Sequence, residues 1–273
     1  MKTILAPTDF SPAAKNACDY AASLCKLLKS KLILFNSYML PVPVFEIPFV
    51  MVTADELEKN NEESIKKETE RLFSTYGIEV EWLVRIGIPD EEIKDLEDEK
   101  DIDLVVMGLK GSGNHSKLIG STTNAVIRKL RKPALVVPET AKFSHIRSVT
   151  YATDFDAEIK LACFAPLLEL LRKLGAHLHV LNVRKETKGM NAEENAGKSR
   201  LEAIWGDIPH SYHFIEDKNM ERAIQHFADE QSIDMLVMVV HHHNFFERIF
   251  GNHLTKDMTA KTHIPLLVLQ DKE

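Results

Sequence analysis

The sequence predicts an α/β fold made of two tandem, doubly wound, five-stranded parallel sheets. Short apolar runs rich in Ile, Leu and Val alternate with longer amphipathic segments, and the order of these runs repeats between the two halves of the chain. Parallel strands that are covered on both faces have such continuous apolar runs. Strand–helix alternation with right-handed crossovers then produces a doubly wound sheet in each half.

Three matching segments define the repeat. The segment 4–11 (ILAPTDFS) returns as 149–156 (VTYATDFD), 102–107 (IDLVVM) as 233–238 (IDMLVM), and 132–137 (KPALVV) as 264–269 (IPLLVL). Because their order and approximate spacing agree, we expect a duplication. The first domain is expected over residues 1–140 and the second over residues 146–273, with the joint near Glu139 to His145.

The spacing of apolar residues and the positions of turn and cap residues predict the helices and strands of the first unit. Strands are expected at roughly 2–7, 32–37, 78–84, 103–107 and 134–137, and helices near 12–29, 54–76, 90–99 and 121–131. Ser11 followed by Pro12 is typical of an N-cap and first helical turn, and Asp156 occupies the matching cap position in the second unit.

Composition limits the class of protein. With 273 residues and 44% hydrophobic residues the chain can bury real cores. Its net charge of -7 leaves no broad basic surface, so we expect no nucleic-acid partner and no membrane surface. The longest apolar stretch, residues 39–53, is short and interrupted by prolines, which argues against a membrane span. We expect the chain to start as a strand without a leader, and its three cysteines form no CxxC pair or disulfide framework. A cytoplasmic protein is the resulting expectation.

A proline-rich loop distinguishes the first unit. The second unit is fourteen residues shorter between its first and fourth strands, and the missing length falls at this loop, Leu40 to Val52. Its apolar side chains are expected to pack on the other unit, on a partner chain, or over the pocket.

Glycines after the fourth strand of the first unit indicate a phosphate site. Gly108 and Gly111 follow the strand, and Gly120-Ser121-Thr122-Thr123 precedes a helix and adds three hydroxyl donors. Glycine lets the backbone approach an anion, and a helix N-terminus offers free N–H groups with a positive dipole end. Lys110 supplies positive charge. Neither a Walker A sequence nor a GxGxxG fingerprint is present.

Each part of this pattern has a structural alternative. A glycine after a strand is often only a turn, and Ser121 can serve only as an N-cap. Asp9, at the end of the first strand, can accept hydrogen bonds from an adenine amino group or a ribose hydroxyl. Its structural alternative is to order the turn into the first helix.

These motifs resemble those of the universal stress protein family. The resemblance rests on Pro7-Thr8-Asp9-Phe10-Ser11, on the glycine pattern and on Lys132 to Val137, and it covers the chain once per half. It implies a sheet in strand order 3-2-1-4-5, of the adenine nucleotide alpha hydrolase-like type. Some members of the family bind ATP or a related adenine nucleotide, and these carry G-2x-G-9x-G followed by Ser or Thr.

The resemblance implies specific roles for residues of the first unit. Pro7, Thr8 and Asp9 would lie near the adenine or ribose, Met107 and Gly108 would flank the ribose, and Gly111, Gly120, Ser121 and Thr122 would hold the phosphates, with or without Mg²⁺. Eight residues rather than nine separate Gly111 from Gly120.

The second unit departs further from the pattern. Val239 replaces Gly108, His242 replaces Gly111, and Asn252 replaces Ser121, although Asp154 and Gly251 persist. A side chain at a phosphate-contacting glycine blocks the backbone approach, so we expect a degenerate site there.

Other candidate chemistry is weaker. His241, His243 and His253 could ligate a metal, but they lack a nearby Cys or carboxylate that completes a site. No catalytic residue is predicted: His115 is the lone candidate base near the phosphate loop, which leaves slow ATP hydrolysis open.

The expected function is an adenine-nucleotide-binding stress-response regulator with an unidentified protein partner. The alternative is a scaffold or interaction module that binds no nucleotide. The two domains are expected to pair with each other through their last strands, and a further homodimer stays open.

Overall fold

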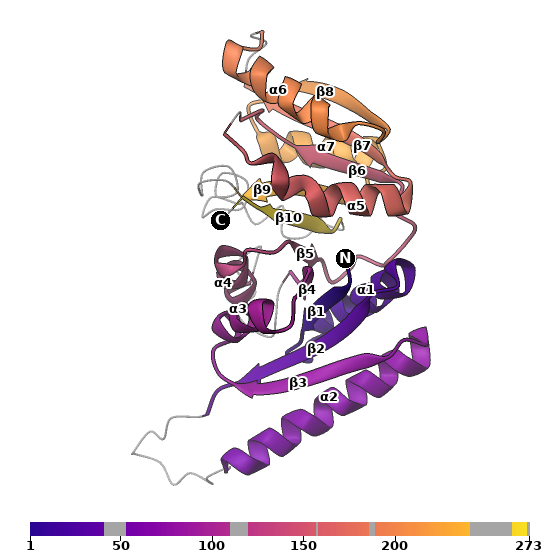
Figure 1. The fold of residues 1–273 in the computed structure, drawn as a ribbon, viewed down its shortest axis with the longest axis vertical. Helices are drawn as coiled ribbons and strands as arrows, with labels where there is room; N and C mark the ends of the chain where they lie inside the picture. Colours follow the sequence, from indigo (N-terminus) through magenta and orange to yellow (C-terminus); the bar gives the residue numbers. More distant parts are fainter. Residues whose placement is uncertain (41–52, 110–119, 157, 186–188, 241–263, 272–273) are drawn as a thin grey trace.

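Ten strands form one continuous, mostly parallel sheet (Figure 1). The computed structural model describes residues 1–273 except 41–52, 110–119, 157, 186–188, 241–263 and 272–273. The strand order is β3-β2-β1-β4-β5-β10-β9-β6-β7-β8. Each half therefore has the order 3-2-1-4-5, and the predicted doubly wound α/β fold is confirmed.

The first unit follows the predicted alternation, with element ends that differ from the expected ones by two residues or fewer. Its elements are β1 (Thr3–Pro7), α1 (Pro12–Leu28), β2 (Lys31–Tyr38), α2 (Ala54–Tyr76), β3 (Val80–Ile86), α3 (Pro89–Glu99), β4 (Leu104–Gly108), α4 (Ser121–Lys129) and β5 (Ala134–Val137).

The second unit repeats this plan. Its described elements are β6 (Ser148–Ala152), the 3₁₀ helix η1 (Leu161–Phe164), α5 (Ala165–Leu174), β7 (His177–Arg184), α6 (Ala192–Trp205), β8 (His210–Glu216), α7 (Met220–Glu230), β9 (Met235–Val240) and β10 (Leu266–Gln270). No helix in the described part of the chain is long and apolar enough to cross a bilayer.

The two units join through their last strands. β5 and β10 run antiparallel, with Val136 opposite Leu266 and Ala134 opposite Val268. Every other strand pair in the sheet is parallel. The predicted pairing of the last strands is thus confirmed. It merges the two expected sheets into one, because each last strand would otherwise be an edge with unpaired backbone groups.

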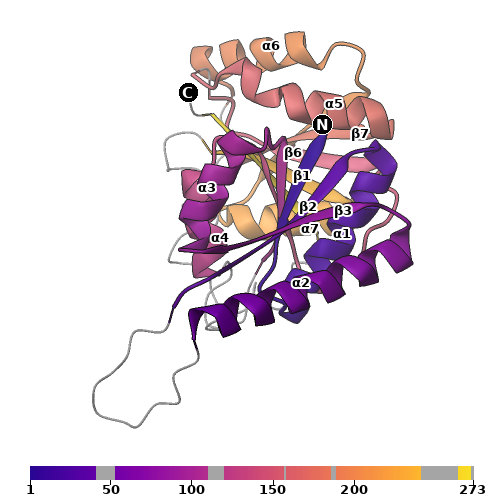
Figure 2. The same cartoon turned by 60° about the horizontal axis from the view of Figure 1, so that its bottom comes forward.

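Helices cover both faces of this sheet, and each face has one apolar core layer. The core against α1, α2, α5 and α6 includes Leu24, Ile65, Leu171 and Trp205. The opposite core contains residues of α3, α4 and α7. Figure 2 shows α3 and α4 together on one side of the first-unit strands, with α1 and α2 on the other.

The turn after the first strand is built identically in both units. The Thr8 hydroxyl accepts the Phe10 N–H (3.0 Å), and the Thr153 hydroxyl accepts the Phe155 N–H (2.9 Å). Both phenylalanines have a φ of 62°, a left-handed conformation that is uncommon for a non-glycine residue. The repeat in the sequence therefore extends to backbone geometry.

Of the two predicted helix caps, one is confirmed. The Ser11 hydroxyl accepts the Ala14 N–H (3.2 Å) at the start of α1. The prediction for Asp156 was wrong: its carboxylate accepts the Glu158 N–H (2.8 Å) in a turn, and η1 begins only at Leu161. The reason is the position of proline, which favours the first helical turn. Pro12 follows Ser11 directly, whereas Ala157 occupies the matching position of the second unit, and a proline stands only at 166, at the start of α5.

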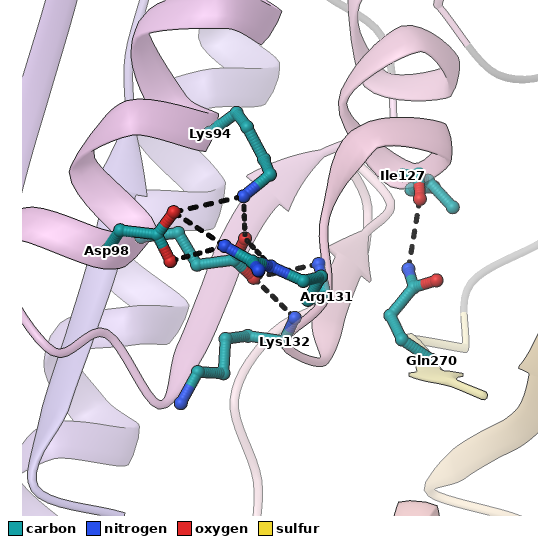
Figure 3. Close-up of polar contacts among 7 residues, drawn as sticks. Lys94, Asp98, Ile127, Arg131, Lys132 and Gln270 are labelled. Carbon is teal, nitrogen blue, oxygen red and sulfur yellow. Dashed lines mark hydrogen bonds and ion pairs between the residues drawn. The ribbon is translucent and has the colours of Figure 1, made fainter. Parts of the chain in front are cut away.

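A buried carboxylate ties α3 to the chain that follows α4 (Figure 3). Glu97 on α3 is 2% exposed and accepts the backbone N–H groups of Arg131 (2.8 Å) and Lys132. The Lys94 Nζ lies 3.3 Å from its other oxygen. The Oε1 atom of Glu97 thus receives two hydrogen bonds, whereas Oε2 has no hydrogen-bond partner among the described residues and is balanced by the charges of Lys94 and Arg131.

The second unit carries a histidine cluster beneath α7. His179 on β7 lies with its Nδ1 3.1 Å from the Nε2 of His213 on β8, and its Nε2 is 3.0 Å from the Ser148 hydroxyl. Its ring also contacts those of His177 and Phe227. Burial, assisted by the two neighbouring histidines, lowers the pKa of His179 to about 4.

Replacing Glu97 tests the α3 anchor. E97A should lower the free energy of unfolding by about 2–4 kcal/mol, because two backbone N–H groups lose their acceptor. Its neighbour Asp98, whose side chain is 62% exposed, provides the control: D98A should lower the free energy of unfolding far less than E97A does, despite the ion pair of Asp98 with Arg131. Urea unfolding measures both, and equal losses would contradict the anchoring role.

The histidine cluster predicts acid sensitivity. The folded pKa of His179 lies below its ordinary value of 6.5, so the unfolded state binds more protons between the two values and stability falls as the pH drops through that window. The repeat places Ile33 at the position of His179. Between about pH 7 and pH 5, the free energy of unfolding of H179I should therefore fall by about 1 kcal/mol less than that of wild type, after allowance for solvent screening.

The control for acid sensitivity is His226 on α7, whose side chain is 71% exposed. H226Q should keep the wild-type dependence of the unfolding free energy on pH. A variant H179I that also keeps it would show that the cluster does not set the acid response.

Candidate functional site

A cavity of 240 Å³ opens at the carboxyl ends of β1, β2 and β4, with α4 as one wall. In a doubly wound sheet this is the edge at which strand order reverses and ligands bind. The lining residues are Pro7, Thr8, Asp9, Ala14, Phe35, Ser37, Pro89, Ile93, Met107, Gly108, Thr122, Thr123 and Val126.

The floor of the cavity begins with the turn after β1. Thr8 is buried and its carbonyl accepts the Asn36 side-chain N–H (2.8 Å), while its own N–H donates to the Phe35 carbonyl (2.8 Å). The Asp9 carboxylate accepts the Ser11 N–H (3.0 Å). Asp9 therefore has the turn-ordering role that the sequence offered as its structural alternative, and its exposed carboxylate also lines the cavity.

The opposite wall is formed where β4 ends and α4 begins. The Thr123 hydroxyl donates to the Gly108 carbonyl (3.0 Å), which fixes the helix against the strand. Gly120 is the N-cap residue of α4, and its N–H donates to the Leu109 carbonyl (2.8 Å). The Gly120 N–H is thus already satisfied within the protein.

The first turn of α4 has the chemistry of an anion site. Asn124 donates the first intrahelical bond, to the Gly120 carbonyl (3.0 Å), and no described side chain caps the N–H groups of Ser121, Thr122 and Thr123. Such uncapped N–H groups carry the positive end of the helix dipole.

Charge and polarity divide the cavity into two parts. Among its described lining residues Asp9 is the one ionisable side chain, and most of the others are apolar. Apolar walls with a few directed polar groups are typical of sites for organic ligands. The apolar part suits a flat ring, while the α4 terminus suits an anionic group.

The structure brings together six of the ten residues predicted for the site. Pro7, Thr8, Asp9, Met107, Gly108 and Thr122 line the cavity. Gly120 and Ser121 begin α4 without lining it. Lys110, Gly111 and His115 lie outside the described residues, as do His241, His243 and His253.

Seven lining residues were not predicted. They are Ala14, Phe35, Ser37, Pro89, Ile93, Thr123 and Val126, although the hydroxyl of Thr123 was expected among the donors of the phosphate site. A signal for some of them exists in the sequence: Ser37 stands near the end of the second strand and Pro89 follows the third, and parallel strands bring such positions to one edge. Ala14, Ile93 and Val126 come from helix faces whose rotation depends on packing.

The second unit has a different surface at the equivalent edge. Val239 on β9 occupies the position of Gly108, and its side chain is only 4% exposed. The side chain of Val183 stands where Ser37 does in the first unit. Within the residues that the structure describes, no group of three or more His, Cys, Asp or Glu side chains could hold a metal ion.

Known proteins resemble this chain in sequence and in fold. Residues 1–138 and 145–270 each match the model of the Universal stress protein family. Universal stress protein MJ0577 of Methanocaldococcus jannaschii is 33% identical over 157 residues, which cover 50% of this chain and 94% of that protein. Universal stress protein Sll1654 of Synechocystis is 33% identical over 138 residues, which cover 50% and 85%.

Solved structures match over nearly the whole length of the chain. The crystal structure of a universal stress protein from Archaeoglobus fulgidus covers 99% of this chain and 98% of its own, with a TM-score of 0.72. Its sequence identity is 18%, so it supports the fold alone. Since both halves match the family model and the two-unit fold recurs, the chain belongs to the universal stress protein family as a tandem member.

Proposed function

We propose that the first unit binds one adenine nucleotide and that the protein is a nucleotide-responsive regulator in the stress response. The observation that carries this proposal is the cavity at the ends of β1, β2 and β4, with the uncapped α4 terminus in its wall. It lies where the family resemblance places the nucleotide.

The proposed pose follows from the two parts of the cavity. The volume of 240 Å³ is smaller than the about 300–1,000 Å³ of whole-ligand pockets, so the nucleoside alone enters it. The base lies among Phe35, Ile93 and Met107, within reach of Asp9. The phosphates point toward the first turn of α4, with Lys110 and Gly111 supplying further contacts as the sequence motif indicates.

In this proposal the second unit has a structural role and binds no nucleotide. The buried Val239 side chain fills the place where the Gly108 backbone borders the cavity in the first unit. We therefore propose one site per chain, whose occupancy changes the surface that a protein partner contacts.

The first test asks what the purified protein carries. Denaturation should release one adenine nucleotide for each chain, identified by chromatography and mass spectrometry, and ATP, ADP and AMP should bind again to the emptied protein. Two nucleotides per chain would contradict a degenerate second unit. Absence of both release and rebinding would favour the alternative, a scaffold that binds only proteins.

The second test separates the ligand role of Asp9 from its turn role. D9A should weaken ATP binding about tenfold and reduce the preference for ATP over GTP, because Asp9 accepts a hydrogen bond from the ligand. The repeat provides the control, since Asp154 follows the same turn in the second unit. D154A should leave ATP affinity unchanged, as titration calorimetry measures, and an unaltered base preference in D9A would assign Asp9 to the turn alone.

A further inference from the structure

The end of α4 is completed by a residue of the other unit. The last carbonyls of a helix have no partner within it. The Val126 carbonyl accepts the Leu130 N–H (3.0 Å). The next carbonyl, that of Ile127, accepts the side-chain Nε2 of Gln270 (3.0 Å), the last residue of β10 (Figure 3).

The presence of a glutamine at this position needs an explanation. Gln270 ends the strand sequence LLVLQ, is 5% exposed, and lies on the same strand face as Leu266 and Val268, which pack in one core layer with Ile127. Its Oε1 has no hydrogen-bond partner among the described residues. A buried amide whose oxygen has no hydrogen-bond partner is less favourable than an apolar side chain at the same position. The hydrogen bond to the Ile127 carbonyl is therefore what glutamine contributes here and an apolar residue could not.

The contact runs in one direction between the units. In the repeat, Pro138 occupies the position that Gln270 has in the second unit. A proline side chain has no donor, so the first unit cannot make the equivalent bond. The second unit thus supports a helix of the first through a side chain whose counterpart, Pro138, has no donor to offer in return.

The supported helix is a wall of the nucleotide cavity. α4 has nine residues, and Thr122, Thr123 and Val126 of this helix line the cavity. A rod of about 13 Å transmits a shift at one end to the other. Its C-terminal side is held from two directions: by Glu97 through the N–H groups that follow the helix, and by Gln270 through Ile127 (Figure 3).

We propose that Gln270 is a positioning residue for the nucleotide site: by capping α4 from the second unit, it sets where the first turn of α4 meets the phosphates. This inference rests on the proposed function, because the phosphates are its ligand. It assigns the second unit a role in the site of the first, which it exerts through the hydrogen bond from Gln270 to α4.

The experiment compares ligands that differ only in their phosphates. Q270M keeps the length of the side chain and removes the donor. It should weaken ATP and ADP binding about fivefold and change adenosine binding by less than about twofold, because the α4 terminus meets phosphate and not the nucleoside. A uniform loss for all three ligands, or no loss, would overturn the proposal.

A matched control excludes a general effect on stability. Leu269 is the preceding residue of β10, is fully buried, and packs on the opposite face of the sheet from α4. L269A weakens the same strand without touching Ile127. It should leave the ratio of ATP to adenosine affinity at the wild-type value, and a ratio that falls as it does in Q270M would overturn the proposal.

Amide hydrogen exchange tests the positioning role of Gln270 in the nucleotide-free protein. In the nucleotide-free protein, the Leu130 and Asn124 amides of α4 should exchange faster in Q270M than in L269A. Exchange that is equally fast in the two variants would show that Gln270 does not hold α4. If wild type binds no adenine nucleotide while Q270M still loosens α4, the proposed function fails and the contact between the units stands.

Discussion

The antiparallel pairing of β5 with β10 is the interaction on which the rest of the molecule depends. Each unit by itself would end in a strand with one unpaired edge, and pairing satisfies both edges at once. Leu135 and Leu267 are buried on one face of this junction, and Val136 and Leu266 are buried on the other, so both core layers continue from one unit into the other. The chain consequently forms one sheet with helices packed on both faces. Residues of one unit can therefore contact helices of the other.

Duplication has kept the structural parts of the unit and changed its ligand-facing parts. Thr8 and Thr153 order the same strained turn, and Asn36 and Asn182 each donate to the carbonyl of the corresponding threonine at 2.8 Å. At the end of the fourth strand, in contrast, Gly108 has become a buried valine. A turn that the fold requires persists in both copies, while Gly108 and Gly111 of the proposed ligand site are replaced by Val239 and His242 in the second copy.

The position of α4 shows how stability and the site are connected. Its start borders the cavity, and its end is held by a buried carboxylate from α3 and a buried amide from β10. Both anchors satisfy backbone groups that would otherwise be unpaired near the helix end. A short helix with few intrahelical bonds depends strongly on such contacts.

The sequence by itself determined the fold class, the strand order through the family resemblance, and six of the cavity residues, because apolar runs and turn residues act locally. Tertiary structure decided the rest. Ala14, Ile93 and Val126 reach the cavity only through helix packing, and Asp156 is not a helix cap, because no proline follows it and the next helical element begins only at Leu161. The contact of Gln270 with Ile127 joins residues 143 positions apart, and no local pattern predicts a hydrogen bond over that separation.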